Sequence, residues 1–175
     1  MIKAKKITKE EIDKLVKQKG KIRGVFFKGF YNYIFEKKGQ EGIKIIEKGL
    51  AEFGYNLNLK KTSSFAWYPE GLIGIIFFLI FKHFDWKESE AFNIGYQSLL
   101  SSFSTKNVLF KLFNVETGLK MVEKYWPKYS TVGKFYYSSY NIKEKWAILR
   151  VEGVNWPYET SCNYIMGVLL PAILN

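Results

Sequence analysis

The stretch that decides the fold is GLIGIIFFLIFKHF, which runs from Gly71 to Phe84 and includes the only histidine of the chain, His83. Its uncharged part ends at Phe81 and is about half as long as the roughly 20 residues that a membrane-spanning helix needs. A helix that is apolar on every side is buried on every side in a globular protein. The stretch therefore predicts a central core helix, which could also form the wall of an internal pocket.

Helical patterns surround this stretch. Thr8 and Glu11 have the spacing of a capping box at the start of a short amphipathic helix. Two longer apolar patterns follow at helical spacing, and Gly39 and Gly54 are their stop signals. After the central helix, Asp85 is a candidate N-cap for a further helix. These patterns predict a helical N-terminal body.

The period of the apolar residues changes near the C-terminus. Phe135–Tyr140 and Trp146–Val151 alternate as strands do and are joined by a short polar connection. A last apolar helical pattern follows, and Pro171 should end it. The sequence therefore predicts an α+β fold with a helical N-terminal body, an antiparallel β-hairpin and a C-terminal helix. Since no segment has linker composition, 1–175 is predicted to be a single domain with 1–20 as an N-terminal helical arm.

The charge of the chain restricts its partners. The formal net charge is +11, and all but two of the 27 basic residues, Arg23 and Arg150, are lysines. Bidentate recognition of phosphates and bases favours arginine, so no specific nucleic-acid partner is predicted. Weak electrostatic association with membranes is compatible with the charge. The enrichment in Lys, Glu and Ile is compatible with a thermophile.

The sequence shows no catalytic motif. The chain has one cysteine, Cys162, and one histidine, which excludes an internal disulfide and a Cys/His zinc cluster. We find no carboxylate pair, no nucleophile–base arrangement and no glycine-rich phosphate loop. The N-terminus lacks the apolar region of a signal peptide. We therefore predict a cytoplasmic, non-enzymatic protein with no catalytic residue, no metal site and no cofactor.

Two single residues have alternative interpretations. His83 is either a helix C-terminal residue favoured by the helix dipole or a ligand-binding group. Cys162, near the start of the last helix, is either a small buried apolar residue or a reactive thiol whose pKa the helix N-terminus lowers.

The order of the segments from Arg23 to Leu174 resembles a known fold. The similar segments read GVFFKGFYNYIFEKKGQEGIKIIEKGL, EAFNIG, VLFKLFNVETGLKMVEKYWP and NYIMGVL. The fold is shared by heme nitric-oxide/oxygen-binding (H-NOX) domains, 4-vinyl-reductase-like domains and TRAPP vesicle-transport subunits. The resemblance implies that 21–175 is a ligand-binding fold of this kind, with an internal pocket.

The chain departs from the H-NOX pattern where that family holds heme. The place of the heme-ligating histidine falls near Gly118, which has no ligand atom. In the region of the family's Tyr-x-Ser-x-Arg motif, Tyr158 and Ser161 have a different spacing, and no arginine follows Arg150. Because the heme propionates need that guanidinium group, the resemblance implies the fold and a pocket but argues against heme.

We therefore hypothesise a non-enzymatic small-molecule-binding or sensor domain with an apolar, aromatic-lined pocket. Its partner would be an apolar small molecule, and a homodimer is left open. The main rival is a scaffold or assembly module of the same fold with a filled core. An auxiliary role of the vinyl-reductase type is a third interpretation. The candidate pocket residues, chosen from the family layout and helical spacing, are Phe77, Phe78, Phe81, Gly118, Met121, Tyr137 and Cys162.

Overall fold

The helices and the hairpin follow one another in the order that the sequence predicts, and the structure adds two short strands that the sequence patterns do not predict. The computed structural model describes residues 8–17, 19–87, 89–102, 115–141, 143–144, 146–154, 160 and 162–168. The elements are α1 (Lys9–Val16), β1 (Lys21–Arg23), α2 (Val25–Glu52), β2 (Trp67–Pro69), α3 (Gly71–Phe84), α4 (Glu90–Ser102), α5 (Val115–Tyr125), η2 (Trp126–Lys128), β3 (Lys134–Asn141) and β4 (Trp146–Glu152). A helical segment at 162–168 follows. The fold is α+β, with a helical body, an antiparallel hairpin and a C-terminal helix, as predicted.

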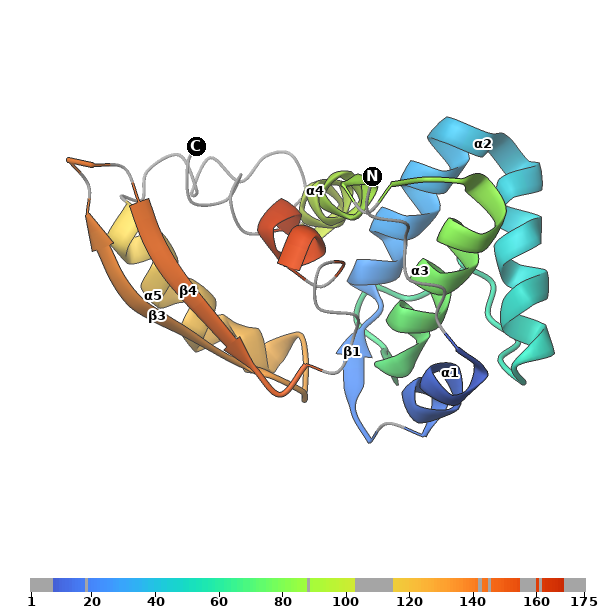
Figure 1. The fold of residues 1–175 in the computed structure, drawn as a ribbon, viewed down its shortest axis with the longest axis horizontal. Helices are drawn as coiled ribbons and strands as arrows, with labels where there is room; N and C mark the ends of the chain where they lie inside the picture. Colours follow the sequence, from blue (N-terminus) through green and yellow to red (C-terminus); the bar gives the residue numbers. More distant parts are fainter. Residues whose placement is uncertain are drawn as a thin grey trace.

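The helical body and the hairpin form opposite ends of the molecule (Figure 1). α1, α2 and α3 lie at one end, and β3, β4 and α5 lie at the other. α4 and the segment 162–168 lie between them. The C-terminal segment therefore returns to the helical body after the hairpin.

α3 is the buried central helix that its sequence predicts. Every residue from Gly71 to Phe77 is buried, and α1 and α2 pack against the helix. Within the described ranges, no helix is long and apolar enough to cross a membrane. Asp85 ends α3 in a left-handed conformation with a φ of 52°, and α4 begins only at Glu90. The expectation that Asp85 caps the start of α4 is therefore wrong.

Gly39 divides α2 into two helical halves. Its φ is 63° and its ψ is −161°, a conformation that glycine adopts at little cost and that other residues rarely adopt. The sequence predicts a helix end at this glycine, and the helical backbone does break there. The chain then resumes the helix at once, so that one long bent element packs against both α3 and α4.

Glycines allow α4 to approach both of its neighbours closely. A Cβ built on Gly29 of α2 would lie 2.0 Å from Ser98 Oγ on α4. On the other side of α4, a Cβ on Gly95 would lie 2.1 Å from the carbonyl oxygen of Tyr164. A Cβ on Gly167 would lie 2.0 Å from the carbonyl oxygen of Phe92. α4 is therefore held between α2 and the segment 162–168 at distances that only glycine permits.

β1 connects three distant parts of the chain. It pairs antiparallel with β2, with Ile22 opposite Tyr68. Ile22 also forms an isolated bridge with Ser130, and Arg23 N donates to the carbonyl oxygen of Tyr129 at 2.8 Å. This short strand therefore joins the helical body to the chain that enters the hairpin.

β3 and β4 form an antiparallel hairpin whose two faces differ. Phe135 is buried and pairs with Val151, while Leu149 and Val151 pack against the hydrophobic core. The register shifts between Tyr137 and Ser139. α5 packs against β3, so one face of the hairpin is covered. The opposite face, which we call the outer face, consists of Lys134, Tyr136, Ser139, Asn141, Trp146, Ile148, Arg150 and Glu152.

Candidate functional site

The predicted pocket centres on Phe77, and this side chain lies in a cluster of aromatic rings. Phe77 has an exposed fraction of 0%. Its ring centroid lies 4.9 Å from that of Phe30, 5.5 Å from that of Tyr164 and 6.0 Å from that of Phe81. These are contact distances for aromatic rings. Side chains from α2, α3 and the segment 162–168 therefore surround Phe77.

A polar pair lies inside this aromatic cluster. Ser98 Oγ is 3.0 Å from the Tyr164 hydroxyl, 3.0 Å from the carbonyl oxygen of Ile94 and 3.2 Å from that of Phe26. Since a carbonyl oxygen only accepts, Ser98 donates to a carbonyl and Tyr164 donates to Ser98. Burial raises the pKa of the Tyr164 hydroxyl well above its usual range, so that Tyr164 stays a neutral donor. The pair ties the segment 162–168 to α4.

The other predicted pocket residues do not all meet at Phe77. Phe81 stacks on Phe77, whereas Phe78 is half-buried and its ring meets that of Phe53, at 6.4 Å between centroids. Cys162 is a free thiol on the exposed surface. The described side chains thus bring together Phe77 and Phe81, while Phe78 and Cys162 have other surroundings. The surroundings of Gly118 in α5 and the side chains of Met121 in α5 and Tyr137 in β3 lie outside what the structure describes, so these assignments remain predictions.

α1 occupies the space next to the glycines at the start of α3. A Cβ on Gly71 would lie 2.0 Å from the carbonyl oxygen of Leu15, and one on Gly74 would lie 2.9 Å from Leu15 Cδ1. Leu15 has an exposed fraction of 4% and belongs to the core. The N-terminal helix therefore fills the space beside these two glycines.

A polar cluster at the start of α4 was missed by the sequence analysis. The Tyr33 hydroxyl donates to Glu90 Oε2, and Asn93 Nδ2 donates to Glu90 Oε2 at 2.9 Å and to the Tyr33 hydroxyl at 3.2 Å. The ring of Trp86 meets that of Tyr33 edge-on at 5.3 Å. Glu90 and Asn93 share a helix face at i, i+3 spacing, but nothing local indicates that Tyr33 lies opposite them.

This polar cluster shifts the pKa values of two of its members. The hydrogen bond from Tyr33, helped by that from Asn93, lowers the pKa of the Glu90 carboxyl. Burial, followed by the hydrogen bond to Glu90, raises the pKa of Tyr33 to about 12. Glu90 therefore stabilises the fold above its unfolded pKa of about 4.3, and this contribution is lost as the pH falls through the lower folded value. The contribution of Tyr33 is complete below about pH 10 and is lost as the pH rises towards 12.

Replacing Tyr33 by phenylalanine should lower the free energy of unfolding by about 1–2 kcal/mol at neutral pH, because a hydrogen bond to a charged group is lost. The difference from the wild type should shrink in acid, where Glu90 is protonated, and again in strong base, where Tyr33 ionises in the unfolded chain. Urea unfolding followed by circular dichroism at a series of pH values measures both effects. The matched control is Tyr31→Phe on the same helix. A Tyr33→Phe difference that stays constant from acid to neutral pH would refute the linkage.

His83 lies exposed in the last turn of α3. Nowhere in the part of the chain that the structure describes do three His, Cys, Asp or Glu side chains form a group that could hold a metal ion. Comparing the chain with protein-family models, with curated proteins and with solved structures gave no significant match. The chemistry of the described side chains is thus the basis for a functional interpretation.

Proposed function

We propose that the protein is a non-enzymatic assembly module that acts through protein–protein contacts and uses the outer face of the hairpin as its docking surface. We also propose that its fold is related to the one shared by H-NOX domains, 4-vinyl-reductase-like domains and TRAPP subunits. Support comes from the core, where the rings of Phe30, Phe81 and Tyr164 occupy the space around Phe77. Aromatic rings that pack against one another around Phe77 favour a protein that acts through its surface.

The observation that carries the proposal is a pair of exposed apolar side chains on the outer face. Trp146 has an exposed fraction of 43% and Ile148 one of 52%. They lie two residues apart on β4, so they point to the same side of the strand. The indole Nε1 of Trp146 donates to Glu144 Oε2 at 2.8 Å, which holds the ring in place. Adjacent exposed apolar side chains rimmed by polar residues are typical of a protein contact surface.

A second copy of this chain fits the charges of the outer face. Lys134 lies opposite Glu152, and Arg150 lies opposite Tyr136, so both signs of charge occur beside Trp146 and Ile148. A two-fold axis uses the same patch on both subunits. It can bring the basic residues of one copy towards the acidic residues of the other while the apolar pairs meet. The proposed assembly is therefore a symmetric homodimer through the hairpin.

Oligomeric state tests this proposal directly. The wild type should be a dimer at micromolar concentration by size-exclusion chromatography with light scattering. The double variant Trp146→Glu/Ile148→Glu should be a monomer, because it places four uncompensated charges in a small interface.

The matched control is Tyr96→Glu/Leu100→Glu on α4, whose side chains are 40% and 42% exposed. This control variant should remain a dimer. A wild type that stays monomeric, or a control variant that dissociates while the hairpin variant does not, would contradict the proposal.

A small-molecule-binding or sensor domain is the second candidate. It is favoured by the Ser98–Tyr164 pair, since a few polar groups among aromatic side chains are typical of sites that orient an apolar ligand. Native mass spectrometry of the protein purified from cells distinguishes the two candidates. An apolar compound bound at one molecule per chain would support the sensor, and its absence from a dimeric protein would support the assembly module.

A further inference from the structure

The positive charge of the chain is concentrated in three segments. Residues 14–35, 53–69 and 124–143 hold twelve lysines and arginines and no aspartate or glutamate. The rest of the chain holds fifteen basic and sixteen acidic residues, so the net charge of +11 arises from these three segments. Charge that is concentrated along the sequence becomes a feature of the surface where the fold brings such segments together.

The fold brings the three segments together. β1, in the first segment, pairs with β2 in the second and bridges through Ile22 to Ser130 in the third. Lys28 Nζ, in the first segment, donates to the carbonyl oxygen of Lys60, in the second, at 2.8 Å. Parts of the three segments that are far apart in the sequence therefore meet at one junction.

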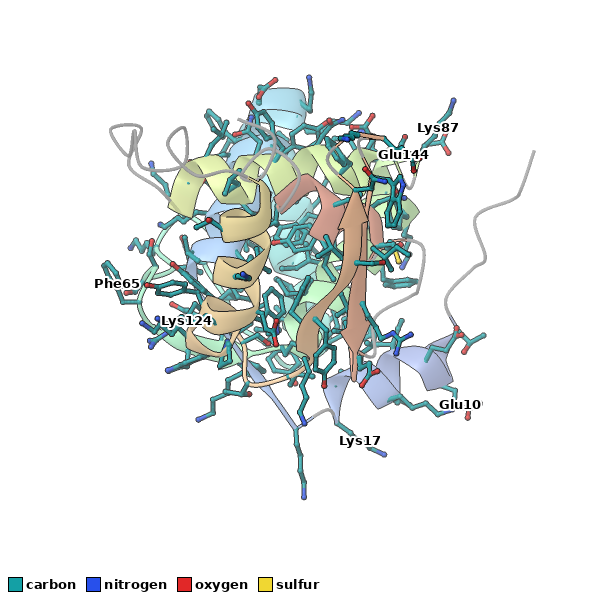
Figure 2. All side chains as sticks on the ribbon, turned by 90° about the vertical axis from the view of Figure 1, so that its left-hand side faces the viewer. Glu10, Lys17, Phe65, Lys87, Lys124 and Glu144 are labelled. Atoms are coloured by element: carbon teal, nitrogen blue, oxygen red, sulfur yellow. The ribbon has the colours of Figure 1, made fainter. Side chains whose placement is uncertain are left out.

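An exposed phenylalanine lies near this junction of β1, β2 and the residues around Ser130. Phe65 has an exposed fraction of 85%, the highest among the exposed large apolar side chains of the described residues. Figure 2 shows Phe65 and Lys124 extending outward from the same side of the molecule. A single exposed phenylalanine is common on protein surfaces, so exposure alone does not distinguish Phe65, and the contacts of its backbone are decisive.

The loop that carries Phe65 is held on several sides. The guanidinium of Arg23 donates from Nη1 to the carbonyl oxygen of Phe65 and from Nε to that of Lys128 at 3.1 Å. Gly24 N donates to the carbonyl oxygen of Ala66 at 2.9 Å. The Arg23 Cζ also lies 4.0 Å from the centroid of the Trp67 ring. Arg23 and Gly24 therefore hold the backbone of the Phe65 loop in place, next to the backbone of Lys128.

We propose that this surface, the basic face, is a docking site for a membrane that contains anionic lipids. Phe65 enters the boundary of the hydrocarbon layer, and the surrounding lysines contact the lipid head groups. The Nζ atoms of Lys124 and Lys128 lie over the Tyr125 ring, 5.9 Å and 4.5 Å from its centroid. We define the basic face as Phe65 with Lys28, Lys60 and its exposed neighbour Lys61, and Lys124 and Lys128.

Two carboxylates border the basic face without cancelling its charge. Glu47 Oε1 accepts from the backbone N of Leu59 at 2.8 Å, which turns it towards the loop backbone. Glu123 is exposed and precedes Lys124. The salt bridges among the described residues involve neither of these carboxylates and none of the five lysines.

A lipid surface fits the basic face better than a nucleic acid does. The guanidinium of Arg23 is already used by two carbonyl oxygens and a ring, so it is not free to bind a phosphate. Lysines with long apolar stems extend to lipid head groups, and tryptophan, as in the half-buried Trp67 of β2, favours membrane interfaces. Bases stack on rings set in a groove, whereas Phe65 protrudes.

Vesicle sedimentation with the full chain tests the proposal. The wild type should bind vesicles of phosphatidylcholine with one-third phosphatidylserine much more tightly than vesicles of phosphatidylcholine alone. Phe65→Ala should weaken binding to the anionic vesicles about tenfold, because one buried phenyl ring is lost. Lys124→Gln/Lys128→Gln should also weaken it about tenfold or more, because each lysine near the surface contributes to the attraction.

Two matched controls distinguish a specific effect of the basic face from the general effect of removing an exposed ring or two lysines. Phe35→Ala removes a ring that is 46% exposed on α2, and Lys37→Gln/Lys44→Gln removes two lysines that pair with Glu36 and Glu41. Both variants should bind like the wild type, and thermal unfolding should show that all variants are folded. Equal binding to both vesicle types, or no loss in Phe65→Ala, would overturn the proposal. So would stoichiometric binding of single-stranded RNA that competes with the vesicles.

Discussion

Replacing Gly29 by valine should lower the free energy of unfolding by about 3 kcal/mol or more, at the upper end of what overpacking costs. A Cβ at this position would lie 2.0 Å from Ser98 Oγ and 2.5 Å from the Cα and the backbone N of Ser98. A side chain can rotate away from a clash, but a backbone cannot, so α4 would have to move off α2. The same movement would disturb the hydrogen bond between Ser98 and Tyr164.

Guanidinium chloride unfolding followed by circular dichroism measures this effect. Lys37→Val serves as the control, because it places the same side chain at an exposed position of the same helix. It should cost less than about 1 kcal/mol, the range of helix propensity. Equal stability of Gly29→Val and the wild type would mean that α2 and α4 do not approach each other this closely.

The second large effect is expected at the aromatic core. Phe77→Ala should cost about 3–5 kcal/mol, the usual range for removing a fully buried phenylalanine. The ring of Phe77 touches those of Phe30, Phe81 and Tyr164, so its removal leaves a cavity that these rings cannot close. Phe78→Ala, one residue along the same helix, should cost distinctly less, because Phe78 is only half-buried.

The pair of variants also bears on the functional hypotheses. If Phe77 bordered an open pocket, its ring would have fewer partners, and its removal would cost about as much as that of Phe78. Equal losses in the two variants would therefore contradict the filled core and favour the small-molecule sensor. A much larger loss at Phe77 would support the assembly module.

Local signals in the sequence identified much of the fold. The capping box at Thr8 and Glu11 is present, because its two hydrogen bonds join residues only three positions apart. The break at Gly39 and the two strands of the hairpin also follow from patterns within short segments. Such features depend on residues that are close together in the sequence, so they can be recognised from one sequence alone.

The surroundings of the candidate residues depend on contacts between distant segments. Leu15 fills the space at Gly71 and Gly74, yet nothing in the sequence of α1 indicates that it packs there. Tyr33 meets Glu90 across 57 positions of the chain. Cys162 is exposed, and its position in a helical pattern cannot reveal which side of that helix faces the core.

The connection through β1 has a consequence for the order in which the protein folds. Lys21 N donates to Thr131 Oγ1 at 2.8 Å across 110 positions of the chain, whereas β1 and β2 meet across fewer than half as many. Contacts that close long loops form slowly because the chain loses more entropy before they form. During synthesis at the ribosome, α1, α2 and the β1–β2 pair can assemble around α3 once α3, which follows β2 in the chain, has emerged. The contacts of β1 with the residues around Ser130 can form only after those residues have been synthesised. The hairpin therefore joins a helical body that has already folded.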